Sequence, residues 1–362
     1  MKKILFIIPS LTGAGAERII THLINNINKE KFTIELLLIF DVKHTFLEKI
    51  TSNIKVYELK KNKSLKFCLF DVMKLVKKIK PNTVFIGSGH LGLLLSPLIV
   101  FNKKIKWIVR ETNFASLNTT KYLAKVFYKV FYKNYDLIIA QCNDMKTDLI
   151  NIFNIPPNKI HIINNPIDTE YIDSQLSYDM DKEIELPKNK INIVACGRLT
   201  YQKGFDLLLE NILKKELNPN KYHLTIIGVG ENDKRDISDK LYEIVKKYNL
   251  KNLVSFVGFK DNIYNWLEKA DIFILSSRFE GFPNILLEAI YCGTPVISNI
   301  CPGGINEIIN DKNGIVFDIE KELVSDKVEQ LLNTKFIKKE LKESIKSKYG
   351  IQEIIYRYEK IL

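Results

Sequence analysis

Short apolar segments alternate with stretches of helical periodicity along this chain, and the alternation starts again near its middle. Strand-like segments in the first half are residues 3–8, 33–40, 83–86, 105–110, 136–140 and 160–163. Helical patterns lie between them at 16–28, 65–80, 91–101, 120–134 and 144–153. Strand character returns at 191–195, 223–227, 253–256, 272–275 and 294–298. Strands that alternate with helices form parallel sheets covered by helices. The pattern predicts an α/β protein of two Rossmann-like, doubly wound domains that face a central cleft.

The predicted domains are residues 1–170 and 171–345, with a C-terminal helix at 346–362. A chain of 362 residues exceeds the usual size of one domain, which agrees with this division. An irregular acidic segment up to about Lys190 is interpreted as a linker. The last helix has apolar residues at helical spacing, so it is predicted to pack back toward the N-terminal domain.

Several protein classes are excluded by simple features. The most apolar stretch, residues 91–101, is interrupted by Gly92 and Pro97 and is too short to span a bilayer. The apolar segment after Met1 lacks a cleavage pattern, so we expect a cytoplasmic protein. The five cysteines are scattered and never form C-x-x-C, which argues for reduced thiols and against structural zinc.

Positive charge is concentrated in the first half of the chain. Residues 1–170 contain 26 Lys and Arg against 13 Asp and Glu, which gives this half a net charge of +13. The rest of the chain carries −1, and the two parts sum to the net charge of +12. A run of lysines spaced four apart lies on one helix face, with aromatic residues between them: Lys121, Lys125, Lys129 and Lys133. This helix fits either an anionic membrane surface or a solvated stripe over a packed core. No nucleic-acid module accompanies the charge, so nucleic acid is not expected as a partner.

Two carboxylates lie eight positions apart around a turn that follows the apolar run 270–275. Glu280 precedes Gly281 and Pro283, which mark a strand-to-helix turn. Asn284 is the expected N-cap of the next helix, and Glu288 lies one turn into it. A helix start attracts phosphate, and the two acids have the chemistry to accept hydrogen bonds from sugar and ribose hydroxyls. The alternative is a surface loop with a capped helix and two solvated acids.

Two cations and a glycine loop are further candidates for phosphate contacts. Arg198 and Lys203 follow the first strand of the second domain, where they fit the charge of a diphosphate. Gly13 and Gly15 follow the first strand of the chain and permit close backbone approach to a phosphate. Arg18 stands where a dinucleotide fingerprint needs its third glycine, so an NAD site is not expected.

These motifs occur in an order that resembles the family-four retaining glycosyltransferases of GT-B fold, over nearly the whole chain. The most specific parts are the Glu280 to Glu288 segment and the Arg198 and Lys203 pair. The glycine loop departs from the common pattern, because Ala14 stands where a second consecutive glycine is usual.

The resemblance implies a nucleotide-diphosphate sugar bound by the second domain and a glycan acceptor bound by the first, and we expect the sugar to be UDP-linked. It implies that Arg198 and Lys203 neutralise the leaving diphosphate and that Glu280 positions the sugar. His90 matches the active-site histidine of many such enzymes, with a purely structural histidine as the alternative. The residues implied in donor binding are Gly13, Gly15, Gly197, Gly258, Phe259, Gly281, Phe282, Pro283, Asn284, Ile285 and Glu288. Arg110 and Glu111 end another strand of the first domain and are candidates for acceptor contacts.

The predicted activity is therefore retaining transfer of a hexose or N-acetylhexosamine to a glycan acceptor. The basic first domain favours a polyprenyl-diphosphate-linked acceptor, in polysaccharide or lipopolysaccharide synthesis, and a peripheral place at the membrane. No cofactor or metal is expected, since Asp179 and Asp181 match Asp-x-Asp only within the linker. A sugar-nucleotide epimerase of the same fold and a non-catalytic sugar-nucleotide-binding protein are the alternatives.

Overall fold

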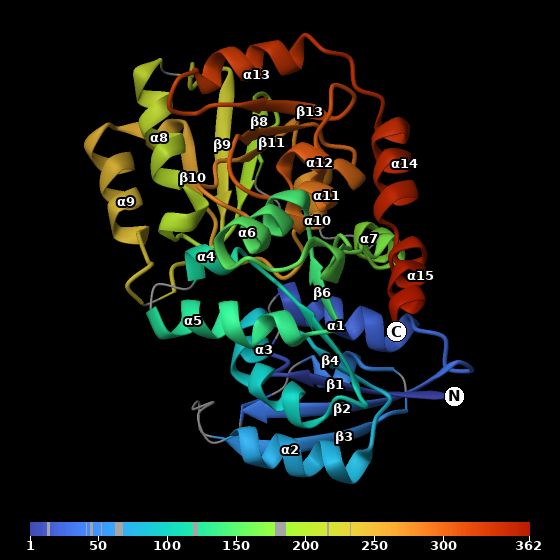
Figure 1. Ribbon diagram of the computed structural model, residues 1–362. Coiled ribbons are helices and arrows are strands. Elements are labelled where there is room, and N and C mark those ends of the chain that lie inside the picture. The colour runs from blue at the N-terminus through green and yellow to red at the C-terminus, as the bar shows by residue number, and fades with distance from the viewer. Residues whose placement is uncertain are drawn as a thin grey trace. The chain divides into compact units, whose positions relative to one another are not determined.

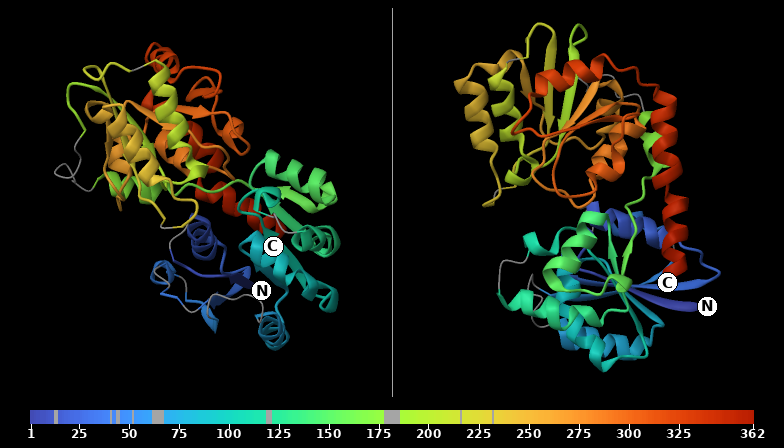
Figure 2. Two further views of the ribbon diagram at one scale, coloured as in Figure 1. Left: turned by 90° about the vertical axis from the view of Figure 1, so that its left-hand side faces the viewer. Right: turned by 45° about the horizontal axis from the view of Figure 1, so that its top comes forward.

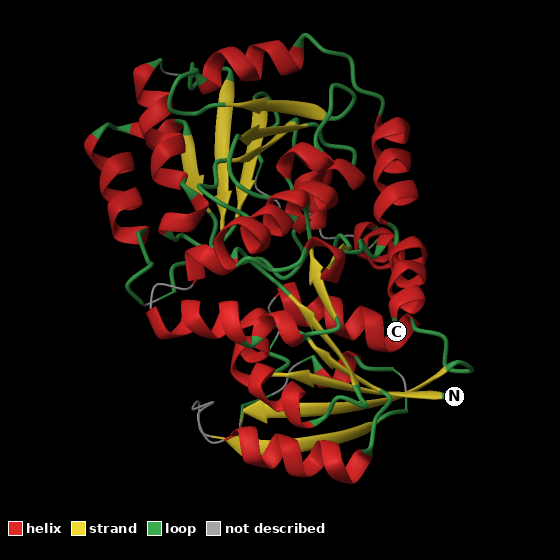
Figure 3. Cartoon of the chain, in the orientation of Figure 1, coloured by secondary structure: helices red, strands yellow, loops and turns green. Residues whose placement is uncertain are grey.

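The computed structural model describes residues 1–362 except 13–14, 41, 44–45, 52, 62–67, 119–121, 178–185, 216 and 232. The described chain forms two compact units (Figure 1). The N-terminal unit comprises Met1–Pro166 together with Ile351–Leu362, and the C-terminal unit comprises Ile167–Gly350. In each unit, helices lie on both sides of a parallel sheet (Figure 3). The two predicted Rossmann-like folds are confirmed.

The sheet of the N-terminal unit has the strand order β3-β2-β1-β4-β5-β6-β7. Its strands are β1 Lys2–Ile8, β2 Phe32–Phe40, β3 Lys55–Lys61, β4 Thr83–Ile86, β5 Lys106–Arg110, β6 Leu137–Ala140 and β7 Ile160–Ile162. β1 pairs with β2 on one side and with β4 on the other. The order of strands therefore reverses between β1 and β4, the position where such sheets place ligands.

Helices cover this sheet, and their apolar faces form its core. They are α1 Gly15–Asn26, α2 Cys68–Ile79, α3 Gly89–Leu95, α4 Ala115–Asn118, α5 Tyr122–Val130, α6 Asn143–Phe153 and α15 Ile351–Ile361. Short 3-10 turns are η1 Leu47–Lys49, η3 Ser96–Phe101, η4 Tyr132–Asn134 and η5 Pro157–Lys159.

The C-terminal helix α15 belongs to the N-terminal unit and lies beside α1 (Figure 2). Ile354, Ile355 and Tyr358 are buried in one cluster with Phe6 and Phe85 of the sheet. The Tyr358 ring meets the Phe85 ring edge-on at a centroid distance of 6.0 Å. The predicted return of this helix to the N-terminal domain is confirmed.

The sheet of the C-terminal unit has the order β10-β9-β8-β11-β12-β13. Its strands are β8 Ile191–Cys196, β9 Tyr222–Ile227, β10 Val254–Phe256, β11 Ile272–Leu275, β12 Val296–Asn299 and β13 Gly314–Phe317. β8 pairs with β9 and with β11, so the order reverses between β8 and β11. The loops that follow these two strands leave the sheet side by side.

Helices of the C-terminal unit are α7 Thr169–Leu176, α8 Phe205–Lys214, α9 Ser238–Lys247, α10 Tyr264–Lys269, α11 Asn284–Tyr291, α12 Ile305–Ile308, α13 Val324–Leu332 and α14 Lys338–Tyr349. Two 3-10 turns are η6 Tyr201–Lys203 and η7 Leu250–Asn252. Within the described ranges, no helix is both long enough and apolar enough to cross a membrane.

Three sequence-based expectations about secondary structure were wrong. The segment interpreted as a linker contains α7, whose N-cap Asp168 accepts a hydrogen bond from the Tyr171 amide at 2.9 Å. The strands β3 and β13, both at sheet edges, were not predicted. β3 is rich in charged residues, and β13 has an apolar run of only three residues after Gly314. Asn284 is the first residue of α11, and Pro283 takes the N-cap position.

Candidate active site

Two loops at the reversal point of the C-terminal sheet carry the residues predicted from the sequence. One follows β8 and contains η6, which ends in Lys203. The other follows β11 and runs from Ser276 to Pro283. Because β8 and β11 are paired parallel strands, their carboxyl ends bring these loops together.

Lys203 and Glu280 form an ion pair across the two loops. Lys203 Nζ lies 2.7 Å from Glu280 Oε1, and the two side chains are only 16% and 9% exposed. Ser277 Oγ donates to the same carboxylate oxygen at 2.6 Å. Removing one partner of a buried pair leaves an uncompensated charge, so the two residues hold each other in place.

Glu288 lies near this pair, on the buried side of α11. Burial raises the pKa of the Cys196 thiol to about 12, the negative charge of Glu288 adds to the rise, and Lys203 opposes it. Cys196 is the last residue of β8, and the charges of Glu288 and Lys203 both act on its thiol. The Cys196 thiol is therefore expected to stay protonated at neutral pH, which makes it a poor nucleophile.

Arg198 is half-exposed and belongs to a second group of charges. Its guanidinium forms an ion pair with Glu231, which follows the glycine turn after β9. Arg235 Nη2 lies 2.7 Å from the other Glu231 oxygen. A negatively charged ligand at this position would therefore compete with Glu231 for Arg198.

The turn that carries Glu280 is packed against the chain after β12. Glu280 N donates to the Pro302 carbonyl at 2.9 Å, and Gly304 N donates to the Gly281 carbonyl at 3.1 Å. Gly303 has a φ of +139°, and a Cβ there would lie 2.2 Å from the Glu280 carbonyl oxygen. Only glycine permits this approach, which fixes the backbone on either side of Glu280.

The other residues predicted to bind the donor have varied surroundings. Phe282 is buried, and its ring packs on Tyr349 at a centroid distance of 5.6 Å. Its side chain is therefore a packing element, and its backbone remains the candidate for ligand contact. Phe259 is 69% exposed in the loop after β10, next to Gly258, whose carbonyl accepts from Gly228 N at 2.9 Å. Ile285 lies in the first turn of α11, half-buried.

The predicted glycine loop of the N-terminal unit is partly described. Gly13 lies outside the described residues, and Gly15 begins α1. The carboxylate of Glu17 accepts hydrogen bonds from Ser10 Oγ at 2.6 Å and from the Thr12 amide at 2.5 Å. An acid in the first turn of α1 thus holds the strand end that leads into this loop, a role that sequence reasoning missed.

Glu111, which directly follows β5, packs against Gly89, the residue before His90. His90 is exposed, at the second position of α3. Glu111 is buried and accepts hydrogen bonds from the hydroxyl groups of Tyr128, at 3.2 Å, and Tyr132. A Cβ at Gly89 would lie 1.9 Å from Glu111 Oε2, so this carboxyl group packs directly on the residue before His90. It can therefore influence where His90 is placed.

The ionisation of Glu111 is expected to make the stability of the N-terminal unit depend on pH. Burial raises the pKa of Glu111 to about 7, the hydrogen bonds from Tyr132 and Tyr128 lower it, and the charge of Asp148 adds to the rise. The folded-state pKa exceeds the ordinary value of 4.5, so this group stabilises the fold fully below that value and no longer does so above pH 7. The loss across this range is on the order of 3 kcal/mol.

The test compares the free energy of unfolding of the wild type and Glu111→Gln between pH 5 and 8. The chain has two tryptophans, of which Trp107 is buried in the N-terminal unit, so a Trp266→Phe background reports on that unit alone. The stability advantage of the wild type over the variant should shrink as the pH rises. Parallel pH profiles would contradict the expectation.

Arg110, the other candidate for acceptor contacts, is fully buried. Its Nη2 donates to Asn165 Oδ1 at 2.5 Å, while Nε and Nη1 have no hydrogen-bond partner among the described residues. Burial raises the pKa of Tyr358 in α15, and the nearby positive charge of Arg110 opposes that rise. Because the Arg110 side chain is fully buried, it is not positioned to contact an acceptor.

Part of the predicted lysine run is described on α5 and η4. Lys125, Lys129 and Lys133 are exposed, and Lys121 lies outside the described residues. Tyr128 and Tyr132, which lie between these lysines, are buried, as a solvated stripe over a packed core requires. Tyr122 is exposed, as contact with a membrane surface requires. The surface therefore combines exposed lysines with at least one exposed ring.

Several polar residues that hold the site together were not predicted. They lie between or beside the motifs, where no single residue type signals a role. They are Gln202, Asp206, Glu231, Ser276, Ser277, Arg278 and Asn299. The only sequence signal was that they lie at or after the carboxyl ends of apolar strands.

Comparison with known proteins supports the arrangement in both units. The family model "Glycosyltransferase Family 4" matches residues 13–171, and "Glycosyl transferases group 1" matches residues 178–349.

Two relatives and one solved structure are similar over most of the chain. The Campylobacter jejuni N-acetylgalactosamine-N,N'-diacetylbacillosaminyl-diphospho-undecaprenol 4-alpha-N-acetylgalactosaminyltransferase is 27% identical, covering 89% of this chain and 87% of that protein. The Escherichia coli UDP-Gal:alpha-D-GlcNAc-diphosphoundecaprenol alpha-1,3-galactosyltransferase is 28% identical, covering 82% and 76%. A crystal structure of Anabaena HepE in complex with UDP has the same fold, with a TM-score of 0.81, 17% identity and coverage of 100% and 99%.

Proposed function

The chain belongs to the GT-B glycosyltransferases, and we propose that it transfers a hexose or N-acetylhexosamine from a UDP-sugar, with retention, to a lipid-linked glycan. Its first half matches the family 4 model and its second half matches the group 1 model. The observation that carries this proposal is the Lys203 and Glu280 pair at the reversal point of the C-terminal sheet. This is where ligands bind in open α/β sheets.

In the proposed complex, the donor diphosphate lies between Lys203 and Arg198. Breaking the bond between sugar and diphosphate places negative charge on the leaving phosphate. Fixed cations stabilise that charge most when they are already in place and shielded from water. Lys203 is held in this way by Glu280, and Arg198 is available once the diphosphate replaces Glu231. The same two cations supply the charge that a divalent metal would otherwise provide, so we propose a metal-independent reaction.

Glu280 and Glu288 are proposed to bind the two sugar rings of the donor. A buried carboxylate that is ionised accepts hydrogen bonds from hydroxyl groups strongly. Glu280 is proposed to position the transferred sugar, with the backbone from Gly281 to Asn284, and Glu288 to hold the ribose. The backbone at the half-buried Gly258 and the exposed Phe259 is proposed to contact the base. His90 is proposed to contact the sugar or the acceptor hydroxyl.

The acceptor is proposed to be a polyprenyl-diphosphate-linked saccharide in the synthesis of a surface polysaccharide. The two relatives described above carry names that specify diphospho-undecaprenol acceptors, which supports this class. An assay that combines the purified chain, a panel of UDP-sugars and a diphospho-undecaprenol acceptor tests it, with products identified by mass spectrometry and EDTA present in parallel. Conversion of the UDP-sugar without acceptor would point to an epimerase, and binding without any product would reject transfer.

The exposed lysines on α5 and η4 are proposed to bring the enzyme to anionic lipid. We expect the triple variant Lys125→Gln, Lys129→Gln and Lys133→Gln to bind vesicles of anionic lipid at least tenfold more weakly, since each lysine near such a surface contributes about 1 kcal/mol. Sedimentation with vesicles at low and high salt measures this. Substitution of the exposed Lys246, Lys247 and Lys251 of the C-terminal unit is the matched control. Equal binding by the triple variant and the wild type would favour the solvated stripe.

A further inference from the structure

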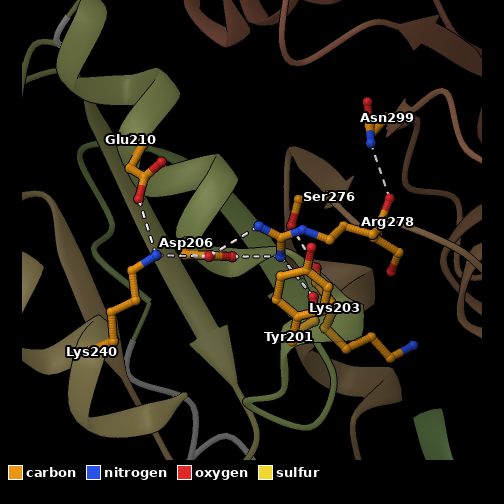
Figure 4. A network of polar contacts seen from close by, with 9 residues as sticks. Tyr201, Lys203, Asp206, Glu210, Lys240, Ser276, Arg278 and Asn299 are labelled. Atoms are coloured by element: carbon orange, nitrogen blue, oxygen red, sulfur yellow. Dashed lines mark hydrogen bonds and ion pairs between the residues drawn. The ribbon is translucent and has the colours of Figure 1, made fainter. Parts of the chain in front are cut away.

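Asp206, Arg278 and Tyr201 form a polar network beside the proposed donor site (Figure 4). Asp206 lies in the first turn of α8, and its side chain is almost completely buried. Arg278 Nη1 lies 2.8 Å from Asp206 Oδ1, and Nη2 lies 3.1 Å from Oδ2. Two parallel contacts of this kind fix the orientation of a guanidinium group as well as its position.

Arg278 also binds the loop that carries Lys203. Its Nη1 donates to the Tyr201 carbonyl at 2.7 Å, and its guanidinium lies 3.9 Å from the centre of the Tyr201 ring. Its backbone amide donates to the Gln202 carbonyl at 2.8 Å. One residue of the Glu280 loop therefore contacts the two residues that precede Lys203.

Two further side chains bind the backbone of the opposite loop. Ser276 Oγ donates to the Lys203 carbonyl at 3.0 Å, and Gln202 Nε2 donates to the Phe279 carbonyl at 3.1 Å. Gly204 has a φ of +64°, and a Cβ there would lie 2.1 Å from the Ser276 carbonyl oxygen. The two loops are thus in direct contact at the position where the Lys203 chain turns into α8.

We infer that Asp206 and Arg278 are positioning residues that hold the loops of Lys203 and Glu280 in the register needed for sugar transfer. This inference rests on the proposed function of Lys203 and Glu280. Figure 4 shows the Lys203 side chain directed away from Asp206, so the network acts on the backbone of Lys203 and not on its ammonium group. Arg278 and Asp206 act through Lys203 and Glu280 and need not touch the substrate.

Asp206 stays ionised in this network. Burial alone would raise the pKa of Asp206, but the hydrogen bonds from Arg278 and Lys240 more than offset it, so the pKa lies below its ordinary value. Lys240, on α9, approaches Asp206 Oδ2 at 2.9 Å and Glu210 at 3.2 Å. It is half-exposed, and its two ion pairs run to α8 rather than to the Lys203 or Glu280 loop.

Lys240 therefore provides a matched control. Both Arg278 and Lys240 are cations paired with the same acid, but only Arg278 is bonded to the loop of Lys203. The experiment compares Arg278→Met, Arg278→Lys, Asp206→Asn and Lys240→Met. For each variant, kcat, the KM for the UDP-sugar and the Kd for UDP are measured, together with the melting temperature.

We expect Arg278→Met to lower kcat by roughly 10²-fold, because a displacement of about 1 Å in a reacting group costs that much. The Kd for UDP should change much less, since Arg198, Lys203 and Glu288 remain. Arg278→Lys still pairs with Asp206 and should recover part of the lost kcat. Asp206→Asn should lower kcat in the same direction, and Lys240→Met should leave it within about threefold of the wild type.

Three outcomes would overturn the inference. The first is a kcat for Arg278→Met close to that of the wild type, and the second is an equal loss in Lys240→Met. The third is unfolding of both Arg278→Met and Asp206→Asn, which would assign the pair to stability alone. A failure of the proposed function is separate, because it would appear as full transfer by Lys203→Ala whatever the result with Arg278.

Discussion

Replacement of Lys203 by alanine is expected to reduce sugar transfer by roughly 10²- to 10³-fold, the loss seen when one fixed donor to a developing negative charge is removed. In the proposed reaction, the leaving diphosphate gains charge as its bond to the sugar breaks. Lys203 is the more enclosed of the two candidate cations, and its position is fixed by Glu280 at 2.7 Å. The loss should therefore fall mainly on kcat, with a smaller increase in the Kd for UDP.

The variant also leaves Glu280 without its cation, so stability has to be measured beside activity. Loss of one partner from a buried pair costs about 3–5 kcal/mol. Lys203→Arg keeps the charge, so it is expected to retain more activity than Lys203→Ala and to have a melting temperature closer to that of the wild type. Lys215→Ala is the matched control, because Lys215 also pairs with an acid, Asp326 at 2.8 Å, in the same unit but at an exposed position. Transfer by a folded Lys203→Ala within tenfold of the wild type would reject the diphosphate role.

The alternation of strands and helices predicted most of the fold, because its signal is local. Buried parallel strands such as β1 and β11 contain short continuous apolar runs, which their length and the turn residues that follow them identify. The edge strand β3 reads Lys-Val-Tyr-Glu-Leu-Lys-Lys and resembles a charged surface segment. Helix α7 buries a single residue, Ile172, so its apolar pattern is too weak to detect. Elements at the margin of a sheet carry less of the core and are therefore harder to predict.

The candidate site was predicted in its residue types but not in its partners. The sequence placed Lys203 and Glu280 after separate strands, 77 positions apart, and no local pattern reports that they form one ion pair. Partners of this kind depend on strand order, which brings β8 beside β11. The same limit applies to Arg110, whose position at a strand end suggested contact with a ligand. Arg110 is fully buried, and its charge acts on Tyr358 of α15, a helix that lies more than 200 residues later in the chain.

Because α15 packs into the core of the N-terminal unit, removing its buried aromatic ring is expected to lower the stability of that unit strongly. Tyr358→Ala should destabilise the N-terminal unit by about 3–5 kcal/mol, the usual cost of truncating a large buried aromatic side chain. Tyr358 is fully buried against Phe85, and Ile354 and Ile355 are buried beside it. Tyr356 lies on the same helix but is 54% exposed, and its ring is covered by Lys360 Nζ at 4.1 Å from the ring centre. Tyr356→Ala removes the same atoms from the same helix, so it should cost at most about 0.5 kcal/mol.

The comparison of these two variants isolates burial from helix propensity, because the two tyrosines share a helix and lie two positions apart. Unfolding is followed by denaturant titration in the Trp266→Phe background, where Trp107 reports on the N-terminal unit. If α15 completes the core of this unit, Tyr358→Ala lowers the denaturation midpoint while Tyr356→Ala does not. The C-terminal unit serves as a control, because Trp266 reports on it in a Trp107→Phe background. Its midpoint should change much less with either variant. Equal midpoints for the two variants would show that α15 contributes little to the core. The N-terminal unit would then owe its stability to residues 1–166 alone, and the chain's last helix would have to be explained by something other than packing.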